Sequence, residues 1–315
     1  MPGSTLPSEP KSAMSVTELQ ALISLLEDPD EGIFVTVKQE LEKIGEAAVP
    51  PLRRALEEEG HGLVFVERAK ALLDQLATEG VRSLFADWIE SADHGVAEAL
   101  FLINQYVDPA EGNSELRETF ERIRQDVWLE LNDDMTALEQ VRVVNRIFFE
   151  HHGFEGTRGG AARPTDALPS EVLFKRKGNS LALGAVYLAI SQELGLPIHG
   201  VNLPNHFILA YCDGGHLGGF AEGGSPSSVL FYINPFNKGG VIHPDEVNAF
   251  LGHLELPVDQ RHCGPCHPID VVRRLIGNLA YAFERQEDLA QAERMRELLF
   301  FVEGCSAKEG AESPE

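Results

Sequence analysis

Apolar residues recur at helical spacing throughout the first part of the chain. The run Leu19, Leu22, Ile23, Leu25 and Leu26 predicts a first helix, which the polar turn at 27–30 ends. Further helices are expected over 31–44, from about residue 50, and over 63–78, 81–91, 94–106 and 114–130. The helix over 31–44 stops at Gly45, a natural terminator because glycine takes positive φ without steric penalty. This region predicts an α-helical bundle behind a Pro/Ser-rich leader.

The pattern changes in the second part of the chain. An amphipathic helix over 136–150 and irregular sequence over 151–177 precede a strongly apolar helix over 181–194, which we expect to be central because both its faces look buried. Short runs at 198–201, 206–211 and 229–233 predict strands of a small antiparallel sheet. Helices over 268–285 and 288–302 predict a terminal hairpin. The fold class is therefore α+β.

These patterns predict five segments. They are a disordered leader (1–14), a helical region (15–130), an α+β core (131–262), a helical hairpin (263–304) and a disordered tail (305–315).

Charge narrows the classes of partner. The 315 residues include 26 basic and 50 acidic side chains, a formal net charge of −24. Such a chain is repelled by phosphate, so we expect no nucleic acid and no anionic membrane among its partners. Residues 1–135 hold 28 acidic and 11 basic side chains, so most of the excess belongs to the helical region.

The sequence also bears on the compartment. Four cysteines form no secreted disulfide framework, no apolar run reaches the ~18 residues of a membrane span, and the first ten residues lack the pattern of a signal peptide. We therefore expect a cytoplasmic protein.

One arrangement in the core is typical of acyl-transfer chemistry. In thiol acyl-transfer enzymes, a nucleophile at a helix amino terminus faces a histidine on one strand, which a carboxylate or amide on the next strand orients. The corresponding positions here are Ser180, His206 and Asn234.

The surrounding motifs identify a family. The run RKGNSLALGAVYLAISQELGLPIHGVNLPNHFILAY, followed by FYINPFNKGG, resembles the SirB-type branch of the transglutaminase-like superfamily, which has a papain-like core. The resemblance extends over about 125–300 and includes VVRRLIGNLAYAFERQEDLAQAERMRELL, which is similar to paired TPR-like helices. In the helical region, LLEDPDEGIFVTVKQELEKIGEAAVPPLRRAL resembles a HEAT-type repeat.

The resemblance implies a degenerate triad. Catalytic members carry cysteine, histidine and aspartate, where this chain has Ser180, His206 and Asn234. A serine hydroxyl is much harder to ionise than a thiol. We therefore expect a non-catalytic binding or scaffold module with a protein partner on its helical regions. The alternative is an amide or ester acyl-transfer enzyme or hydrolase that uses these three residues.

Two of the triad positions also have a structural interpretation. Ser180 can be a helix N-cap, and His206 can be a partly buried histidine bonded to the sheet. Cys212 cannot replace the missing thiol, because six residues of extended strand separate it from His206 by about 20 Å. We expect Cys212 to be a small core residue, and Cys305 lies in the predicted tail.

Two further groups of residues are candidates for binding. Arg176, Lys177, Asn179 and Asn205 could bind a small anionic ligand near the triad, or they could belong to a solvated loop. The cluster His262, Cys263, Cys266 and His267 has the spacing of a zinc half-site and of a thioredoxin-type dithiol. It follows a polar loop rather than a strand, which argues against the dithiol. A loop leading into the next helix is the simplest interpretation, and apart from zinc no cofactor is expected.

Overall fold

The computed structural model describes residues 15–58, 60–91, 94–109, 113–158, 162–204, 206–213, 229–257 and 259–312. Contacts divide the chain into two compact units, residues 1–80 and 81–315. The predicted segment ranges, with a boundary near 130, stay a prediction. Each unit is described by itself.

The first unit is helical. Its elements are α1 (Val16–Ser24), α2 (Glu31–Ile44), α3 (Val49–Glu57) and the first part of α4 (Leu63–Glu90). Helix α1 begins with a capping box, in which Ser15 and Glu18 satisfy each other's backbone N–H groups. Leu26, Leu41, Leu52 and Phe65 are fully buried in a core of this unit's own. Whether these helices are a HEAT-type repeat stays a prediction.

Helix α4 differs from the expected pair of helices over 63–78 and 81–91, because it is continuous. Gly80 lies inside it with no atom within 4 Å of the position where a Cβ would stand. A glycine in a helix interior costs only about 1 kcal/mol relative to alanine, which is too little to end a helix this long.

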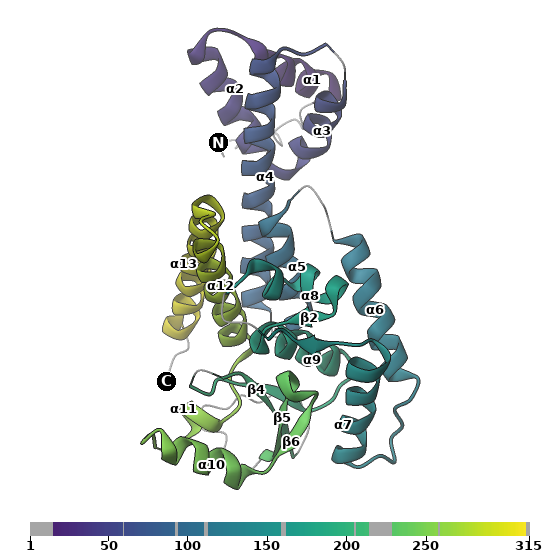
Figure 1. Ribbon diagram of the computed structural model, residues 1–315. Helices are drawn as coiled ribbons and strands as arrows, with labels where there is room; N and C mark the ends of the chain where they lie inside the picture. The colour runs from purple at the N-terminus through teal and green to yellow at the C-terminus, as the bar shows by residue number, and fades with distance from the viewer. Residues whose placement is uncertain are drawn as a thin grey trace, which may run out of the picture. The chain divides into compact units, whose positions relative to one another are not determined.

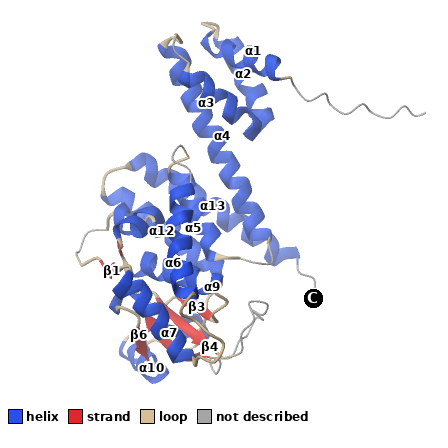
Figure 2. Cartoon of the chain, turned by 90° about the vertical axis from the view of Figure 1, so that its right-hand side faces the viewer, coloured by secondary structure: helices blue, strands red, loops and turns tan. Residues whose placement is uncertain are grey.

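The second unit contains most of the elements (Figures 1 and 2). Its helices beyond α4 are α5 (Val96–Val107), α6 (Ser114–Trp128), α7 (Ala137–Asn145), α8 (Pro169–Lys175), α9 (Ser180–Glu193), α10 (Pro244–His253), α11 (Gln260–Cys263), α12 (Pro268–Arg285) and α13 (Leu289–Glu312). A π-helical segment, Arg146–His151, follows α7 directly. Helices α12 and α13 pack against each other as the predicted hairpin (Figure 1), and α13 continues to Glu312 although the sequence predicts a disordered tail from 305.

The sheet is antiparallel and has the strand order β3, β4, β5, β6. Its strands are β3 (Ile198–Val201), β4 (Ile208–Cys212), β5 (Val229–Asn234) and β6 (Gly240–Ile242). In the register, Gly200 pairs with Leu209, and Leu209 pairs with Ile233. A separate parallel pair joins β1 (Glu155–Gly156) to β2 (Lys177–Gly178). Helices with a small antiparallel sheet confirm the predicted α+β class.

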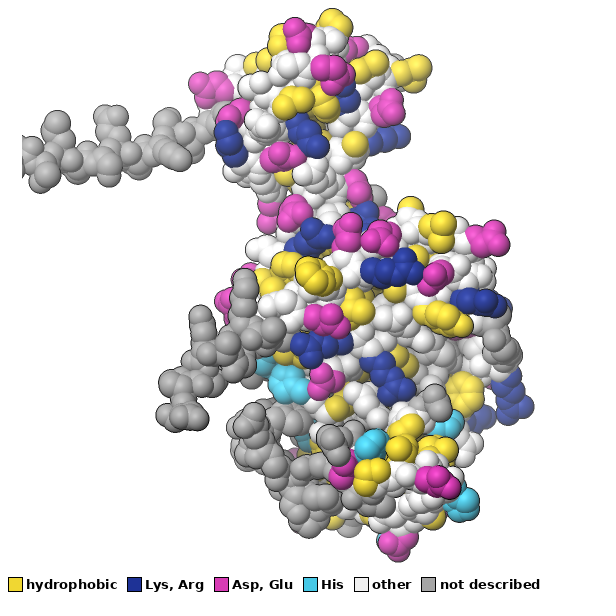
Figure 3. Space-filling view, turned by 90° about the vertical axis from the view of Figure 1, so that its left-hand side faces the viewer, with side chains coloured by type: hydrophobic (Ala, Val, Ile, Leu, Met, Phe, Trp, Pro, Cys, Tyr) yellow, Lys and Arg dark blue, Asp and Glu magenta, His cyan; other side chains and the backbone are white. Residues whose placement is uncertain are grey.

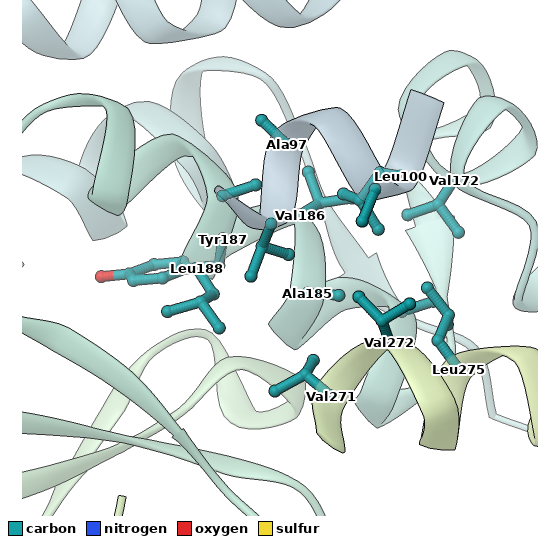
Figure 4. Packing of buried hydrophobic residues seen from close by; sticks show 14 of the residues in the cluster. Ala97, Leu100, Val172, Ala185, Val186, Tyr187, Leu188, Val271, Val272 and Leu275 are labelled. Carbon is teal, nitrogen blue, oxygen red and sulfur yellow. The ribbon is translucent and has the colours of Figure 1, made fainter. Parts of the chain in front are cut away.

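Helix α9 is the centre of the second unit, as its sequence predicts. Eleven consecutive residues, from Leu181 to Ser191, are buried. Figure 4 shows its side chains Ala185, Val186 and Leu188 between Leu100 of α5 and Val271 of α12. A helix covered on all sides is held rigidly, so its first residue has a fixed place.

The surface of the second unit mixes both signs of charge. On the face shown in Figure 3, Lys and Arg side chains lie interspersed with Asp and Glu. Several such side chains form ion pairs, for example Arg296 with Glu284 at 2.7 Å. Within the described ranges, no helix combines the length and apolar character needed to cross a bilayer.

Candidate functional site

A cavity of about 570 Å³ opens where the amino terminus of α9 meets the start of β4 and the end of β5. Its polar lining includes Ser180, His206 and Asn234, so the three positions predicted from the sequence meet in one place. The other lining residues are Thr157, Asn179, Leu203, Phe207, Ile208, Phe236, Ile242, Glu246, Val247 and Phe250. The size and mostly apolar walls are typical of a ligand pocket.

Ser180 is the first residue of α9, and it does not cap the helix. The cap is Asn179, whose side-chain oxygen accepts a hydrogen bond from the Ala182 N–H at 2.9 Å. The Asn179 amide also donates to Asn278 on α12 at 2.8 Å. The alternative in which Ser180 is the N-cap is therefore wrong, because the side chain of the preceding residue, Asn179, accepts the backbone N–H group that an N-cap accepts. The Ser180 hydroxyl has no hydrogen-bond partner among the described residues.

His206 is exposed and precedes β4, so the predicted strand starts two residues later than the sequence suggests. Its backbone N–H donates to the Leu203 carbonyl at 3.1 Å, which closes a turn around Pro204. Its own carbonyl accepts from Arg274 of α12 at 3.0 Å. The imidazole lies edge-on to the ring of Phe250, with centroids 5.4 Å apart. The alternative of a partly buried histidine bonded to the sheet is wrong.

Asn234 ends β5 and holds the turn that follows. Its side-chain oxygen accepts the N–H groups of Phe236 at 3.1 Å and Asn237 at 3.2 Å. A carbonyl oxygen has two lone pairs, so these two bonds occupy the atom that would orient a histidine. Within the described part of the chain, no hydrogen bond joins Ser180, His206 and Asn234 to one another.

The sequence does not single out the acidic lining residue, Glu246. It lies on α10, one turn before Phe250, so the two side chains share a face of that helix. The signal in the sequence is weak, because Pro244 and the capping-box spacing of His243 and Glu246 also fit a loop. Among the lining residues that the structure describes, Glu246 is the one carboxylate, and none is lysine or arginine.

The basic run has other partners. Lys175 pairs with Glu171, and Lys177 pairs with Glu155 at 2.8 Å. The guanidinium of Arg176 lies 4.9 Å from the ring centroid of Phe154, and burial lowers its pKa.

The predicted ligand-binding residues that the structure describes do not all line the cavity. Neither Arg176 nor Lys177 is among the described lining residues of the cavity, Asn179 lines it, and Asn205 lies outside the described residues.

The predicted zinc cluster does not converge either. His262 Nδ1 contacts Asp259 at 2.9 Å, and the Cys263 thiol donates to the Asp259 carbonyl at 3.1 Å. His267 caps α12 by accepting from the Ile269 N–H. Among the described residues, no three of the four predicted ligand atoms lie close enough to share an ion.

Neither Cys212 nor Cys305 is among the described residues that line the cavity. Cys212 is buried in β4 as expected, and burial raises its pKa to about 11. Cys305 lies in α13, outside the cavity lining that the structure describes.

Comparison with known proteins identifies relatives of this core. The sequence profile of the transglutaminase-like superfamily matches residues 111–277. Human F-box only protein 21 is 28% identical over 144 residues, which are 45% of this chain and 22% of that protein. The UPF0162 protein of Vibrio cholerae is 24% identical over 211 residues, covering 66% of this chain and 73% of that protein.

A third relative comes from Salmonella typhimurium. Its protein SirB1 is 27% identical over 174 residues, covering 54% of this chain and 60% of SirB1. The chain thus spans about a fifth of F-box only protein 21 and larger parts of the two bacterial relatives. No solved structure matches the chain.

Proposed function

The chain belongs to the transglutaminase-like superfamily, in its SirB-type branch, and we propose that it is a non-catalytic binding module whose cavity holds a short apolar segment of a protein partner. The observation that carries this proposal is the bonding of Asn234. Its side-chain oxygen accepts two backbone N–H groups of its own turn. It therefore has no lone pair left for His206.

The nucleophile position supports the same proposal. A helix amino terminus activates a thiol by favouring the thiolate, but a serine must lose its proton to a base. Ser180 has no hydrogen bond to His206 among the described residues. A hydroxyl that is not hydrogen-bonded to a base is a weak nucleophile, which argues against the first step of acyl transfer.

The walls indicate what the cavity would hold. Three phenylalanines, Phe207, Phe236 and Phe250, share it with aliphatic side chains. A few polar groups in an apolar pocket fix the orientation of a ligand. The surrounding helices offer further surface for a protein partner. A similar stretch of 144 residues is also part of the longer F-box only protein 21.

A second candidate function is amide or ester acyl transfer by Ser180, His206 and Asn234. One observation favours it, because all three residues line the same cavity at the amino terminus of a helix. Hydrogen bonds in a catalytic site can also tighten only when the substrate is bound.

Labelling with a fluorophosphonate probe separates the two functions. We expect no stoichiometric labelling of the intact chain. The matched variants are Ser180→Ala and Ser114→Ala, because Ser114 also follows an asparagine N-cap as the first residue of its helix, α6. Stoichiometric labelling that Ser180→Ala abolishes and Ser114→Ala keeps would overturn the non-catalytic proposal.

Binding is tested by displaying random peptides against the intact chain and then against Phe250→Ala. Peptides that bind the cavity should be apolar, and the variant should weaken them. Peptides whose affinity is unchanged in Phe250→Ala would place binding elsewhere and contradict the role of the cavity.

A further inference from the structure

A cluster of metal-ligating side chains lies outside the cavity, in the second unit. Asp126 is near the end of α6, His151 is the last residue of the π-helical segment, and His152 follows it as the C-cap. Their ligand atoms all lie within 4.8 Å of one another. We propose that Asp126, His151 and His152 bind a zinc ion.

The backbone explains how two consecutive histidines reach one carboxylate. In an α-helix adjacent side chains point about 100° apart and do not face each other. Here the chain is π-helical, with the His152 N–H donating to the Ile147 carbonyl five residues back at 2.9 Å. Gly153 then takes φ +74°, a left-handed conformation that favours glycine. This wider turn, which is often found at functional sites, aims both rings at Asp126.

The distances suit a small ion after side-chain adjustment. Asp126 Oδ2 lies 2.8 Å from His152 Nε2 and 4.0 Å from His151 Nε2. Zinc binds imidazole nitrogen and carboxylate oxygen at about 2.0–2.2 Å, so ligand atoms around it stand roughly 3.3 Å apart. Each observed separation from Asp126 is within about 1 Å of that value, and the three ligand atoms all lie within 4.8 Å of one another.

The exposure of the three residues favours an open site. The side chain of His152 is 10% exposed, that of Asp126 33%, and that of His151 64%. The inner histidine is therefore fixed by its surroundings, while the outer one is free to turn toward an ion. Three protein ligands leave a fourth position for water, as in zinc sites that are not fully closed.

The donor atoms favour zinc over the alkaline-earth ions. Mg²⁺ and Ca²⁺ prefer oxygen ligands and would gain from one carboxylate only. Zinc gains from both imidazole nitrogens, so it is the better match to two histidines and one aspartate.

The test is titration of the full, chelator-treated chain with zinc in a calorimeter. We expect one zinc per chain. His151→Ala should weaken zinc binding at least about 10-fold, because loss of even a residue that hydrogen-bonds to a metal ligand lowers metal affinity by about that factor. This variant removes an exposed side chain and should fold. Asp126→Asn should weaken binding as well.

Two controls make the result specific. His243→Ala removes an exposed histidine that also lies beside a carboxylate, Asp245, at 3.2 Å, and it should leave zinc binding unchanged. The double variant Cys263→Ser/Cys266→Ser should also keep the zinc. Cobalt in place of zinc should give no thiolate charge-transfer absorption.

Each contrary outcome overturns the proposal. It fails if the chain binds no zinc, if a folded His151→Ala keeps the full affinity, or if the double cysteine variant loses the ion. In the last case, zinc binds at the loop of residues 262–267 instead.

Discussion

Replacing Gly239 by alanine should disturb the turn that carries Asn234. Gly239 has φ +70°, and a Cβ there would stand 1.8 Å from Asn145 Oδ1. Asn145 joins two groups: its amide donates to the Gly239 carbonyl at 2.9 Å, and its oxygen accepts from the Tyr187 hydroxyl at 3.0 Å. Tyr187 is fully buried in α9, and burial raises its pKa. The new methyl group would therefore displace Asn145 and break both bonds.

The cost has two separable parts. A left-handed backbone costs alanine about 1–2 kcal/mol relative to glycine. Loss of the Asn145 to Gly239 bond costs about 0.5–1.5 kcal/mol, and a buried Tyr187 hydroxyl without an acceptor costs about 1–3 kcal/mol. We expect Gly239→Ala to lower the free energy of unfolding by roughly 3–6 kcal/mol.

Gly195 provides the matched control. It has φ +71°, but no atom lies within 4 Å of its Cβ position. Gly195→Ala carries the same backbone cost and the same change in the unfolded chain, so the difference between the variants isolates the displacement of Asn145. Urea denaturation should show Gly239→Ala to be less stable than Gly195→Ala by roughly 2–4 kcal/mol. In a Tyr187→Phe background this difference should shrink. Equal stability of the two alanine variants would refute the reasoning.

Three further predictions follow from burial. Gly184→Ala places a methyl 2.5 Å from the Phe207 ring, so it should cost about 1–3 kcal/mol in denaturation, whereas Gly252→Ala, with open space around it, should not destabilise the chain. Burial raises the pKa of Cys266 to about 12, so iodoacetamide at pH 8 should alkylate it far more slowly in the native than in the unfolded chain; equal rates would contradict the raised pKa. Burial lowers the pKa of His199 below 6.5, so as the pH falls the unfolded state binds this proton before the folded state does. The free energy of unfolding should therefore fall as the pH drops through about 6.5. His199→Gln should flatten that part of the pH profile, and an unchanged slope would contradict the role of His199.

Elements with a long periodic pattern could be predicted from the sequence. The expected helices over 31–44 and 268–285 match α2 and α12 in both bounds. Their apolar side chains face a core, so the spacing of apolar residues in the sequence predicts the helix directly. Helices α8 and α10 were not predicted. They have 7 and 10 residues and begin at prolines, which the sequence equally allows in a loop.

The site was predictable only in part. The order of helix and strands places Ser180, His206 and Asn234 in one cavity, and the family resemblance names those positions. The hydrogen bonds of Asn234 were not predictable, because they depend on the conformation of the turn after β5. The cluster around Asp126 was missed for a similar reason. Its histidines follow 25 and 26 residues later and meet it only through a π-helical turn, which has no periodic signal.

The cavity can persist without catalysis because folding already requires its walls. Asn179 caps α9 and ties it to α12, and Asn234 satisfies two backbone N–H groups of its turn. Phe207 packs so closely on Gly184 that it leaves no room for a Cβ. These contacts stabilise the fold, so they keep the pocket open whether or not residue 180 is a nucleophile. It follows that Ser180→Cys alone should not create an acyl-transfer enzyme. A thiol at that position would still face a histidine whose expected orienting partner, Asn234, is bonded elsewhere.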